Sequence, residues 1–428
     1  MEIKPSVLFV TPIIGHPPKG GPEIRIENSI KALSKIARVT VYCRKRKEAI
    51  GGDEADRFLR RYAVDVLYPP MRKDVVWAIN LAKRIANKIF RTLFGRNVFV
   101  LSNNERAEFR DIVKKAVEID ADIVWLGYGN ISYPLLRHIK KRIRVPVVVD
   151  TDSVWSRFVL RGIAYARDDE EIATRERDGR GKEEEEAWGT KLADVTTAVS
   201  EIDAQYYRKL ANNPESVHVF SNVIEPEAYL SNAQIEGIKK PCMFLAGTFG
   251  PRSPMHDAAR WLLDMVMPIL KERGVCPHLY IAGIGSSAML ANTKDENVTI
   301  VGEVSSIVPY LRNATISVVP LRYESGTRFK ILEAGACGIP VVSTTLGAEG
   351  IPAVHGKEIM IADTPVEFAR SIEMIVKDAD MAKRLGDSLR ALVLGKYTIN
   401  NLADEGEEIV GFLMGSAKKN IRKDFPEG

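Results

Sequence analysis

Short apolar segments alternate with longer amphipathic ones along this chain, and this alternation limits the folds open to it. The apolar segments are rich in Val, Ile and Leu and run continuously, which is typical of parallel strands covered by helices on both faces. A polar stretch, 167–186, interrupts the pattern and predicts a solvated helix or loop. In the first half we expect a helix at Glu23–Ile36 and strands at Ser6–Thr11, Val39–Tyr42, Ile123–Leu126, Val145–Asp150, Asp194–Ser200 and Val217–Phe220.

A second series of the same kind follows a segment near Glu225–Lys240, which we expect to link two domains. Each apolar run ends in a glycine or polar turn that leads into a helical pattern. Glycines at the carboxyl ends of parallel strands let a ligand approach the backbone closely. We therefore predict an α/β fold of two Rossmann-like doubly wound domains that face a cleft. The second series of strands is expected at Cys242–Ala246, Leu279–Ala282, Val298–Val301, Ile316–Pro320 and Val341–Ser343.

Charge is distributed unevenly along the 428 residues. The whole chain carries a formal net charge of +5, from 61 Lys and Arg against 56 Asp and Glu. Up to Asp150 there are 29 basic and 16 acidic residues, or +13, which leaves 32 and 40, or −8, for the remainder. A basic half joined to an acidic half predicts that the two halves meet different partners.

The four cysteines and the N-terminus bear on the compartment. Cys43, Cys242, Cys276 and Cys337 are too far apart in sequence for metal-ligand spacing, so we expect neither a disulfide framework nor a metal site. The N-terminus resembles a first strand rather than a signal peptide, and no run of about 20 apolar residues occurs. These features predict a cytoplasmic protein, with peripheral attachment to the inner face of the membrane as an additional expectation.

The most informative segment is Pro320–Gly350, PLRYESGTRFKILEAGACGIPVVSTTLGAEG. It predicts a strand, a loop over Glu324–Thr327, a helix over Arg328–Cys337 and another strand. Ser325 or Thr327 is expected to cap the helix, whose free N–H groups and dipole favour an anion. Arg328 and Lys330 add positive charge, and Glu333 follows about one turn later with a carboxylate that can accept hydrogen bonds from a diol. This order along one helix matches the phosphates and ribose of a nucleoside diphosphate.

The stretch from Gly326 to Thr344 resembles a motif of the GT-B glycosyltransferases of family 4, the group 1 type, which act with retention. Other blocks agree with the resemblance, which spans nearly the whole chain. GGPEIR at Gly20–Arg25 resembles the glycine pair of the family's first loop, and Ala246–Pro268 resembles the opening of its nucleotide-binding domain. Ser221-Asn222-Val223 stands where the family usually has Pro-Asn-Gly, before the domain joint.

The resemblance implies three segments. These are an acceptor-binding domain at 1–225, a nucleotide-sugar-binding domain at 226–396, and a crossover helix with a charged tail at 397–428. The helix, at Tyr397–Met414, is expected to return to the first domain, and the tail from Lys418 onward is expected to be mobile.

The implied reaction moves a hexosyl group from a UDP- or GDP-linked sugar to a saccharide, lipid-linked or small-molecule acceptor. It needs neither a metal nor a cofactor, because the protein itself stabilises the charge of the leaving diphosphate. Arg328 and Lys330 are the expected catalytic cations. The residues implied to bind the donor are Gly20, Gly21, Arg252, Gly302, Val304, Ser325, Gly326, Thr327 and Glu333.

Two departures from the family pattern matter. The family pairs two glutamates eight residues apart, but Ser325 stands eight residues before Glu333, and Glu324 is one place off. The family also often has a histidine after the strand at Val145–Asp150, where this chain has Asp152. Asp150 and Asp152 are therefore candidates to contact the donor sugar or the acceptor hydroxyl. For Asp152, capping of the following turn is the competing interpretation.

Residues 75–94, VVWAINLAKRIANKIFRTLF, form a basic amphipathic pattern. As a helix, this segment would have a narrow apolar stripe at i, i+4 spacing on one side and many cations on the opposite side. That arrangement fits either a helix that lies on an anionic membrane or a surface helix that packs on a core. Nucleic acid is not an expected partner, because the basic half has no nucleic-acid-binding motif and few aromatic residues among its cations.

Two other functions fit the same fold. A sugar-nucleotide epimerase would need acid and base groups around the donor sugar, for which His16 and His256 are the candidate histidines. A non-catalytic binding subunit would explain the missing first glutamate.

Overall fold

The computed structural model describes residues 4–69, 103–230 and 235–423. It divides into two compact units, Met1–Phe220 with Ala403–Gly428, and Ser221–Leu402. Each unit is built on one sheet in which every described strand pairing is parallel. These sheets confirm the predicted α/β class with two Rossmann-like domains. The basic stretch 75–94 lies outside the described residues, so its contact with a membrane stays a prediction.

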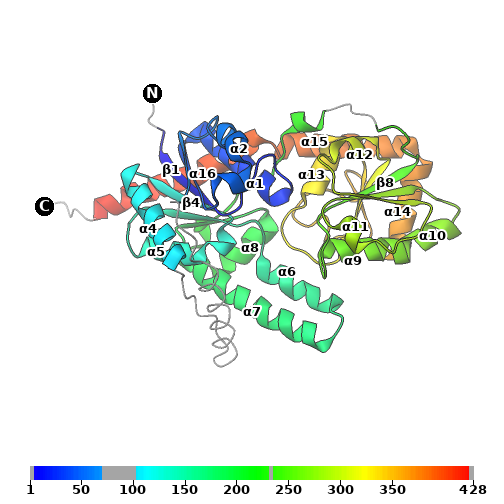
Figure 1. Ribbon diagram of the computed structural model, residues 1–428, viewed down its shortest axis with the longest axis horizontal. Helices are drawn as coiled ribbons and strands as arrows, with labels where there is room; N and C mark the ends of the chain where they lie inside the picture. The colour runs from blue at the N-terminus through cyan, green and yellow to red at the C-terminus, as the bar shows by residue number, and fades with distance from the viewer. Residues whose placement is uncertain (1–3, 70–102, 231–234, 424–428) are drawn as a thin grey trace. The chain divides into compact units, whose positions relative to one another are not determined.

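The first unit has a seven-stranded sheet of order β3-β2-β1-β4-β5-β6-β7 (Figure 1). Its strands are β1 (Ser6–Thr11), β2 (Arg38–Cys43), β3 (Asp65–Leu67), β4 (Ile123–Gly127), β5 (Val147–Asp150), β6 (Val195–Ala198) and β7 (Val217–Val219). Its α-helices are α1 (Gly21–Ile36), α2 (Gly52–Leu59), α4 (Asn103–Glu118), α5 (Tyr133–Lys140), α6 (Trp155–Arg161), α7 (Asp169–Leu192) and α8 (Glu201–Leu210). Short 3₁₀ turns occur at Lys47–Ile50, Gly129–Ile131, Gly162–Tyr165 and Pro214–Ser216.

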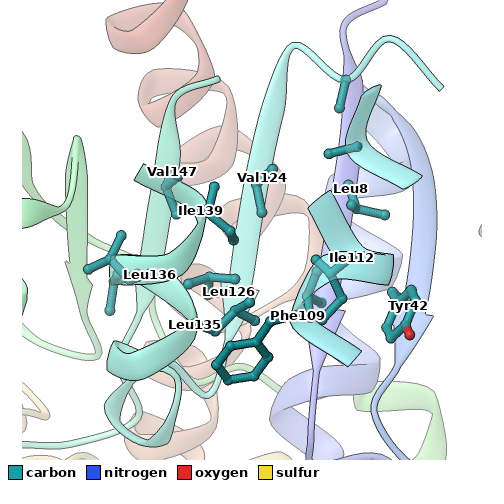
Figure 2. Packing of buried hydrophobic residues seen from close by; sticks show 14 of the residues in the cluster. Leu8, Tyr42, Phe109, Ile112, Val124, Leu126, Leu135, Leu136, Ile139 and Val147 are labelled. Carbon is teal, nitrogen blue, oxygen red and sulfur yellow. The ribbon is translucent and has the colours of Figure 1, made fainter. Parts of the chain in front are cut away.

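Helices cover both faces of this sheet because its central strands are apolar on both sides. On one face α4 and α5 pack over β1, β4 and β5, with Phe109, Ile112 and Leu135 in the core (Figure 2). On the other face, Gly127 lies so close to Phe9 and Ile26 that a Cβ there would be 2.5 Å from the phenyl ring. This packing fixes the carboxyl ends of β1 and β4, from which the loops at that edge of the sheet start.

The second unit has a six-stranded sheet of order β10-β9-β8-β11-β12-β13. Its strands are β8 (Cys242–Ala246), β9 (His278–Ala282), β10 (Val298–Gly302), β11 (Ile316–Val319), β12 (Val341–Ser343) and β13 (Met360–Ile361). Its α-helices are α9 (Pro254–Trp261), α10 (Met267–Glu272), α11 (Ser286–Met289), α12 (Val308–Asn313), α13 (Phe329–Ala336), α14 (Pro365–Lys377) and α15 (Ala379–Lys396). A 3₁₀ turn at Pro226–Tyr229 and a π-helical turn at Leu262–Val266 complete it.

Every strand predicted above is present, most within one residue at each end, and β5 starts at Val147 rather than Val145. The patterns missed two short strands, β3 and β13, which lie at the edges of the sheets. An edge strand is buried less completely, so its apolar run is shorter; Asp65 at the start of β3 is exposed.

The polar stretch 167–186 and the C-terminal segment are both largely helical. The polar stretch 167–186 lies almost wholly in α7, which starts where Asp168 accepts a hydrogen bond from the Glu171 amide over 2.7 Å. In Figure 1, α6 and α7 lie side by side and extend away from the first sheet. The last helix, α16 (Ile399–Lys423), continues past Met414 into the charged segment that starts at Lys418. From Ala403 onward this helix belongs to the first unit.

Among the described residues, none of the helices combines the length and the apolarity that crossing a bilayer requires.

Candidate functional site

The sheet of the second unit reverses its strand order between β8 and β11. From β8 the chain proceeds to β9 and β10 on one side, and from β11 to β12 and β13 on the other. In open parallel sheets, ligands bind at the carboxyl ends of the strands beside this switch point. The loops that follow β8 and β11 flank it, and they carry Arg252, Ser325, Gly326, Thr327 and Arg328. The topology thus brings together five of the residues that the sequence pointed to.

Glycines let three strand ends on this edge continue as close neighbours. The Gly247 amide donates to the Ala282 carbonyl over 3.1 Å, and the Gly283 amide donates to the Gly302 carbonyl over 2.7 Å. Gly283 has φ +127°, and a Cβ there would lie 1.9 Å from the Gly247 carbonyl oxygen, so no other residue fits. Gly302, also at positive φ, ends β10 and leads to the partly exposed Val304.

The loop after β8 is fastened to the loop after β11. The Tyr323 hydroxyl donates to the Arg252 carbonyl over 2.9 Å, and Arg322 makes a two-pronged contact with Asp257 at 2.9 and 2.5 Å. Arg252 itself adopts φ +60°, a strained conformation for a non-glycine residue, and its side chain is exposed. This arrangement holds an exposed cation at the switch point without burying it.

Arg328 orders the loop that follows β11. The residue is 5% exposed, and its Nη1 donates to the Ser325 carbonyl over 2.6 Å and to the Gly326 carbonyl. Gly326 allows the turn with φ +82°, and Asn222 Nδ2 donates to Thr327 Oγ1 over 2.9 Å. Arg328 therefore orders the turn that precedes α13. It is also the residue at the N-cap, without a side-chain cap, so the expected cap by Ser325 or Thr327 was wrong.

Lys330 lies in the first turn of α13, beside the free N–H groups at the start of that helix. It is partly buried, and its ammonium makes no hydrogen bond or ion pair with any residue that the structure describes. Burial lowers the pKa of Lys330 below its usual value, and the neighbouring Arg328 lowers it further. An anion bound here would supply the missing partner and favour the charged ammonium.

Glu333 lies about one turn further along α13 and is 8% exposed. Its Oε1 accepts a hydrogen bond from the Tyr229 hydroxyl over 3.1 Å. Burial raises the pKa of Glu333, while the bond from Tyr229 and the charge of Lys330 lower it. Within the described part of the chain the carboxylate receives no second hydrogen bond, so its other oxygen is available to a ligand. Tyr229 carried no signal in the sequence, because its turn lies far from any motif.

The first sheet has its own switch point, between β1 and β4. The β1–α1 loop contains Gly20, the N-cap of α1, and Gly21, its first residue, both with ordinary backbone geometry for their positions. The Glu23 carboxylate accepts a hydrogen bond from the Lys19 amide over 2.6 Å and so occupies part of this helix start. His16, in the same loop, lies 2.7 Å from Glu27 through Nδ1 and stacks on Phe58.

Asp150, at the end of β5, is completely buried. Its Oδ1 lies 2.5 Å from Arg25 Nη2 and accepts a hydrogen bond from Thr197 Oγ1 over 2.7 Å. Arg25 also donates to the carbonyls of Phe220 and Thr151. The two predicted aspartates therefore differ, because Asp150 joins α1 to the sheet, whereas Asp152 keeps part of its surface exposed.

Asp152 lies in the short chain segment between β5 and α6. Its Oδ1 accepts a hydrogen bond from Trp155 Nε1 over 3.1 Å, and Tyr128 also donates to the carboxylate. Asn130 fixes the backbone, since its Oδ1 accepts from the Asp152 amide over 3.2 Å and its Nδ2 donates to the Ser153 carbonyl over 2.9 Å. Loss of hydration raises the pKa of Asp152 to about 6, against the opposing effects of Arg25 and these hydrogen bonds.

Residues 242–378, which include the loops after β8 and β11 and the helix α13, match the family model described as glycosyl transferases group 1. No curated protein sequence matches the chain significantly.

Similar solved structures extend over nearly the whole chain. A glycosyltransferase from Rickettsia africae is 13% identical, with a TM-score of 0.65 over 96% of this chain and 99% of that one. Anabaena HepE, solved with UDP and glucose, is 13% identical, with a TM-score of 0.64 over 95% and 99%. Sucrose-phosphate synthase from Thermosynechococcus elongatus is 14% identical, with a TM-score of 0.67 over 96% and 100%. These matches show the GT-B fold, and together with the family model they support a glycosyltransferase.

Proposed function

We propose that this chain transfers a hexosyl group from a UDP- or GDP-linked sugar to a saccharide or lipid-linked acceptor, with retention and without a metal. The observation that carries the proposal is the pair Lys330 and Glu333 on α13. Among the described residues, Lys330 is a partly buried cation without a partner and Glu333 a carboxylate with a free oxygen, and the two lie about one turn apart at the switch point. A nucleoside diphosphate has the phosphates and the ribose diol that such a pair binds.

In the reaction, the bond between the anomeric carbon and the diphosphate breaks first. The electron pair leaves with the diphosphate, and an oxocarbenium-like sugar remains, which the acceptor oxygen attacks on the face that the diphosphate has left. The leaving oxygen gains negative charge as this bond breaks, so a fixed cation at that point lowers the barrier. Lys330 and the N–H groups at the start of α13 are the groups that we assign to this task.

Arg328 acts differently in this proposal. Because its guanidinium donates to the carbonyls of Ser325 and Gly326, it orders the loop against which the diphosphate lies. Arg252, exposed in the neighbouring loop, is assigned to the same phosphates. The acceptor hydroxyl must lose its proton during attack. Asp152, with its pKa raised to about 6, is ionised at neutral pH and basic enough to accept that proton.

Incubation of the purified chain with a panel of UDP- and GDP-sugars tests the proposal. We expect slow release of free nucleotide from one donor, and faster release when the matching acceptor is added. A UDP-sugar is the first choice, since HepE was solved with UDP and glucose. An altered sugar on an intact nucleotide would instead favour the epimerase alternative. Binding without turnover would favour the non-catalytic subunit.

Two further measurements address the chemistry. The anomeric configuration of the product, read by NMR, is expected to match that of the donor, and inversion would contradict retention. Nucleotide release in excess EDTA is expected to equal the rate without it. A loss that added Mg²⁺ or Mn²⁺ restores would contradict the metal-independent mechanism.

A further inference from the structure

A cluster of polar and aromatic side chains lies at the carboxyl end of the first sheet, beside its switch point. Tyr128 follows β4, while Asp152 and Trp155 follow β5, the next strand in the sheet. All three are partly exposed. The donor site described above contains none of these three residues, and the proposed function uses only Asp152 among them.

The cluster is rigid. Tyr128 and Trp155 both donate to the Asp152 carboxylate, and the two rings meet at 75° with their centroids 6.2 Å apart. Lys182, on α7, places its ammonium 5.1 Å from the centroid of the Trp155 ring and pairs with Glu185 over 2.7 Å. The indole is therefore fixed by contacts from β4, the β5–α6 segment and α7.

The backbone beneath the cluster is also held in place, at a cost. Tyr128 adopts φ +62°, a left-handed conformation that is uncommon for a residue with a ring at Cβ. Gly129, which follows it, has no room for a Cβ, since one would lie 2.4 Å from the Val149 side chain. Strained residues that the surrounding fold keeps in place are concentrated at ligand sites.

The chemistry of the cluster matches a sugar ring. Both rings are partly exposed, and the exposed π face of an aromatic ring attracts the weakly positive C–H groups on one face of a pyranose. Asp152, which contacts both rings, can accept a hydrogen bond from a hydroxyl on the rim of that sugar. A carboxylate and an ammonium that both contact Trp155 disfavour a ligand with a large net charge of either sign.

We propose that Tyr128, Asp152 and Trp155 form a subsite for a neutral pyranose in the first unit. The subsite rests on the proposed function, in which it holds the saccharide acceptor and places one of its hydroxyls at Asp152. Because the side chains are already fixed in the free protein, little entropy is lost when the sugar binds.

The test uses the full chain labelled with 5-fluorotryptophan. Its five tryptophans give five ¹⁹F signals, and the one missing from the Trp155→Phe variant belongs to Trp155. We expect millimolar methyl α-D-glucopyranoside or methyl β-D-galactopyranoside to shift the Trp155 signal saturably, and open-chain glucitol at the same concentration to leave it unchanged. No saturable shift with either glycoside, or an equal shift with glucitol, would overturn the proposal.

Variants sharpen this result. Tyr128→Phe removes the hydroxyl that positions Asp152, and Asp152→Asn removes the charge that strengthens its hydrogen bonds. Each change is expected to weaken sugar binding by up to about tenfold, which corresponds to roughly 1.4 kcal/mol. Lys191→Ala, an exposed position on α7, is the matched control and should bind the sugar like the parent chain. Unchanged sugar affinity in both site variants would contradict the assignment even if the Trp155 signal moved.

The readout separates this inference from the proposed function, because it contains no nucleotide. A sugar-dependent Trp155 shift without turnover of any sugar nucleotide would leave the subsite intact and refute the enzyme. Nucleotide release that a saccharide accelerates, without any Trp155 shift, would support the enzyme and place the acceptor elsewhere.

Discussion

The Tyr229 hydroxyl donates to Glu333 Oε1 over 3.1 Å and so joins the turn at Pro226–Tyr229 to α13, the helix that carries Glu333. Glu333 is the residue that we propose binds the ribose of the donor. The hydrogen bond fixes one carboxylate oxygen and opposes the effect of burial, which raises the pKa of Glu333. Arg312 holds the turn from the other side, since its Nη1 donates to the Tyr229 carbonyl over 2.9 Å. Glu333 is thus positioned before any ligand binds.

Replacing Tyr229 with Phe should weaken nucleotide binding, and more so at acidic pH. Loss of the hydrogen bond raises the pKa of Glu333 further, so the carboxylate that accepts from the diol is protonated at a higher pH than in the parent chain. We expect an affinity loss of several-fold at neutral pH, or about 1 kcal/mol. Isothermal titration calorimetry with UDP or GDP between pH 5 and 8 measures it.

Tyr280→Phe is the matched control, because the Tyr280 hydroxyl accepts a hydrogen bond from the Lys239 amide, away from α13. It should leave the pH profile of nucleotide binding unchanged. A Tyr229→Phe profile parallel to that of the parent chain would show that Tyr229 does not tune Glu333.

Asp152→Asn should make the protein more stable and less active. The pKa of Asp152 in the folded protein, about 6, lies above the ordinary aspartate value of about 3.9 that applies to the unfolded chain. A raised carboxyl pKa favours folding while the group is protonated, and this contribution is lost as the pH rises from about 4 to about 6. Above that window Asn removes the cost of the buried charge, so we expect the free energy of unfolding at pH 7.5 to increase by roughly 1 kcal/mol.

The same substitution should abolish the acidic limb of the pH–rate profile. In the parent chain, acceptor-dependent turnover is expected to fall as the pH drops through about 6, because Asp152 becomes protonated. Denaturant unfolding and turnover measured on the same preparations check both effects. An Asn variant that is fully active with an unchanged acidic limb would contradict the role of Asp152 as a base.

Arg25→Met should destabilise the first unit. The Arg25–Asp150 pair is buried, with side chains 2% and 0% exposed, so removing the cation leaves an uncompensated carboxylate. We expect a loss of roughly 3–5 kcal/mol in urea unfolding. The double variant Arg25→Met with Asp150→Asn should recover part of this loss, since the stranded charge is gone. A double variant less stable than Arg25→Met alone would show that the charge is not the cause.

Much of this arrangement could be predicted from the sequence. Continuous apolar runs located the long strands because those strands are buried on both faces, and the Gly326–Thr344 motif located α13 with Lys330 and Glu333. The roles of Arg328 and Asp150 could not be predicted in the same way. Whether a charged side chain turns toward a ligand or toward backbone carbonyls depends on packing between distant segments, such as the contact of Arg25 with Phe220.

Partners that lie far apart in the sequence were missed for the same reason. Tyr229 is more than a hundred residues from Glu333, and Asn130 reaches Asp152 only because β4 and β5 are adjacent. Neither residue belongs to a local motif. The strained backbone of Tyr128 left no trace in the sequence either, because a tyrosine before a glycine is compatible with many turns.

Lys330 is the group to which we assign neutralisation of the diphosphate as it leaves. The direct test is the rate of nucleotide release from the preferred sugar nucleotide by the parent chain, Lys330→Gln and Lys294→Gln, an exposed lysine of the same unit. We predict that Lys330→Gln releases nucleotide roughly 10²–10³ times more slowly, while Lys294→Gln matches the parent chain. Near-normal release by a folded Lys330→Gln variant would contradict the account.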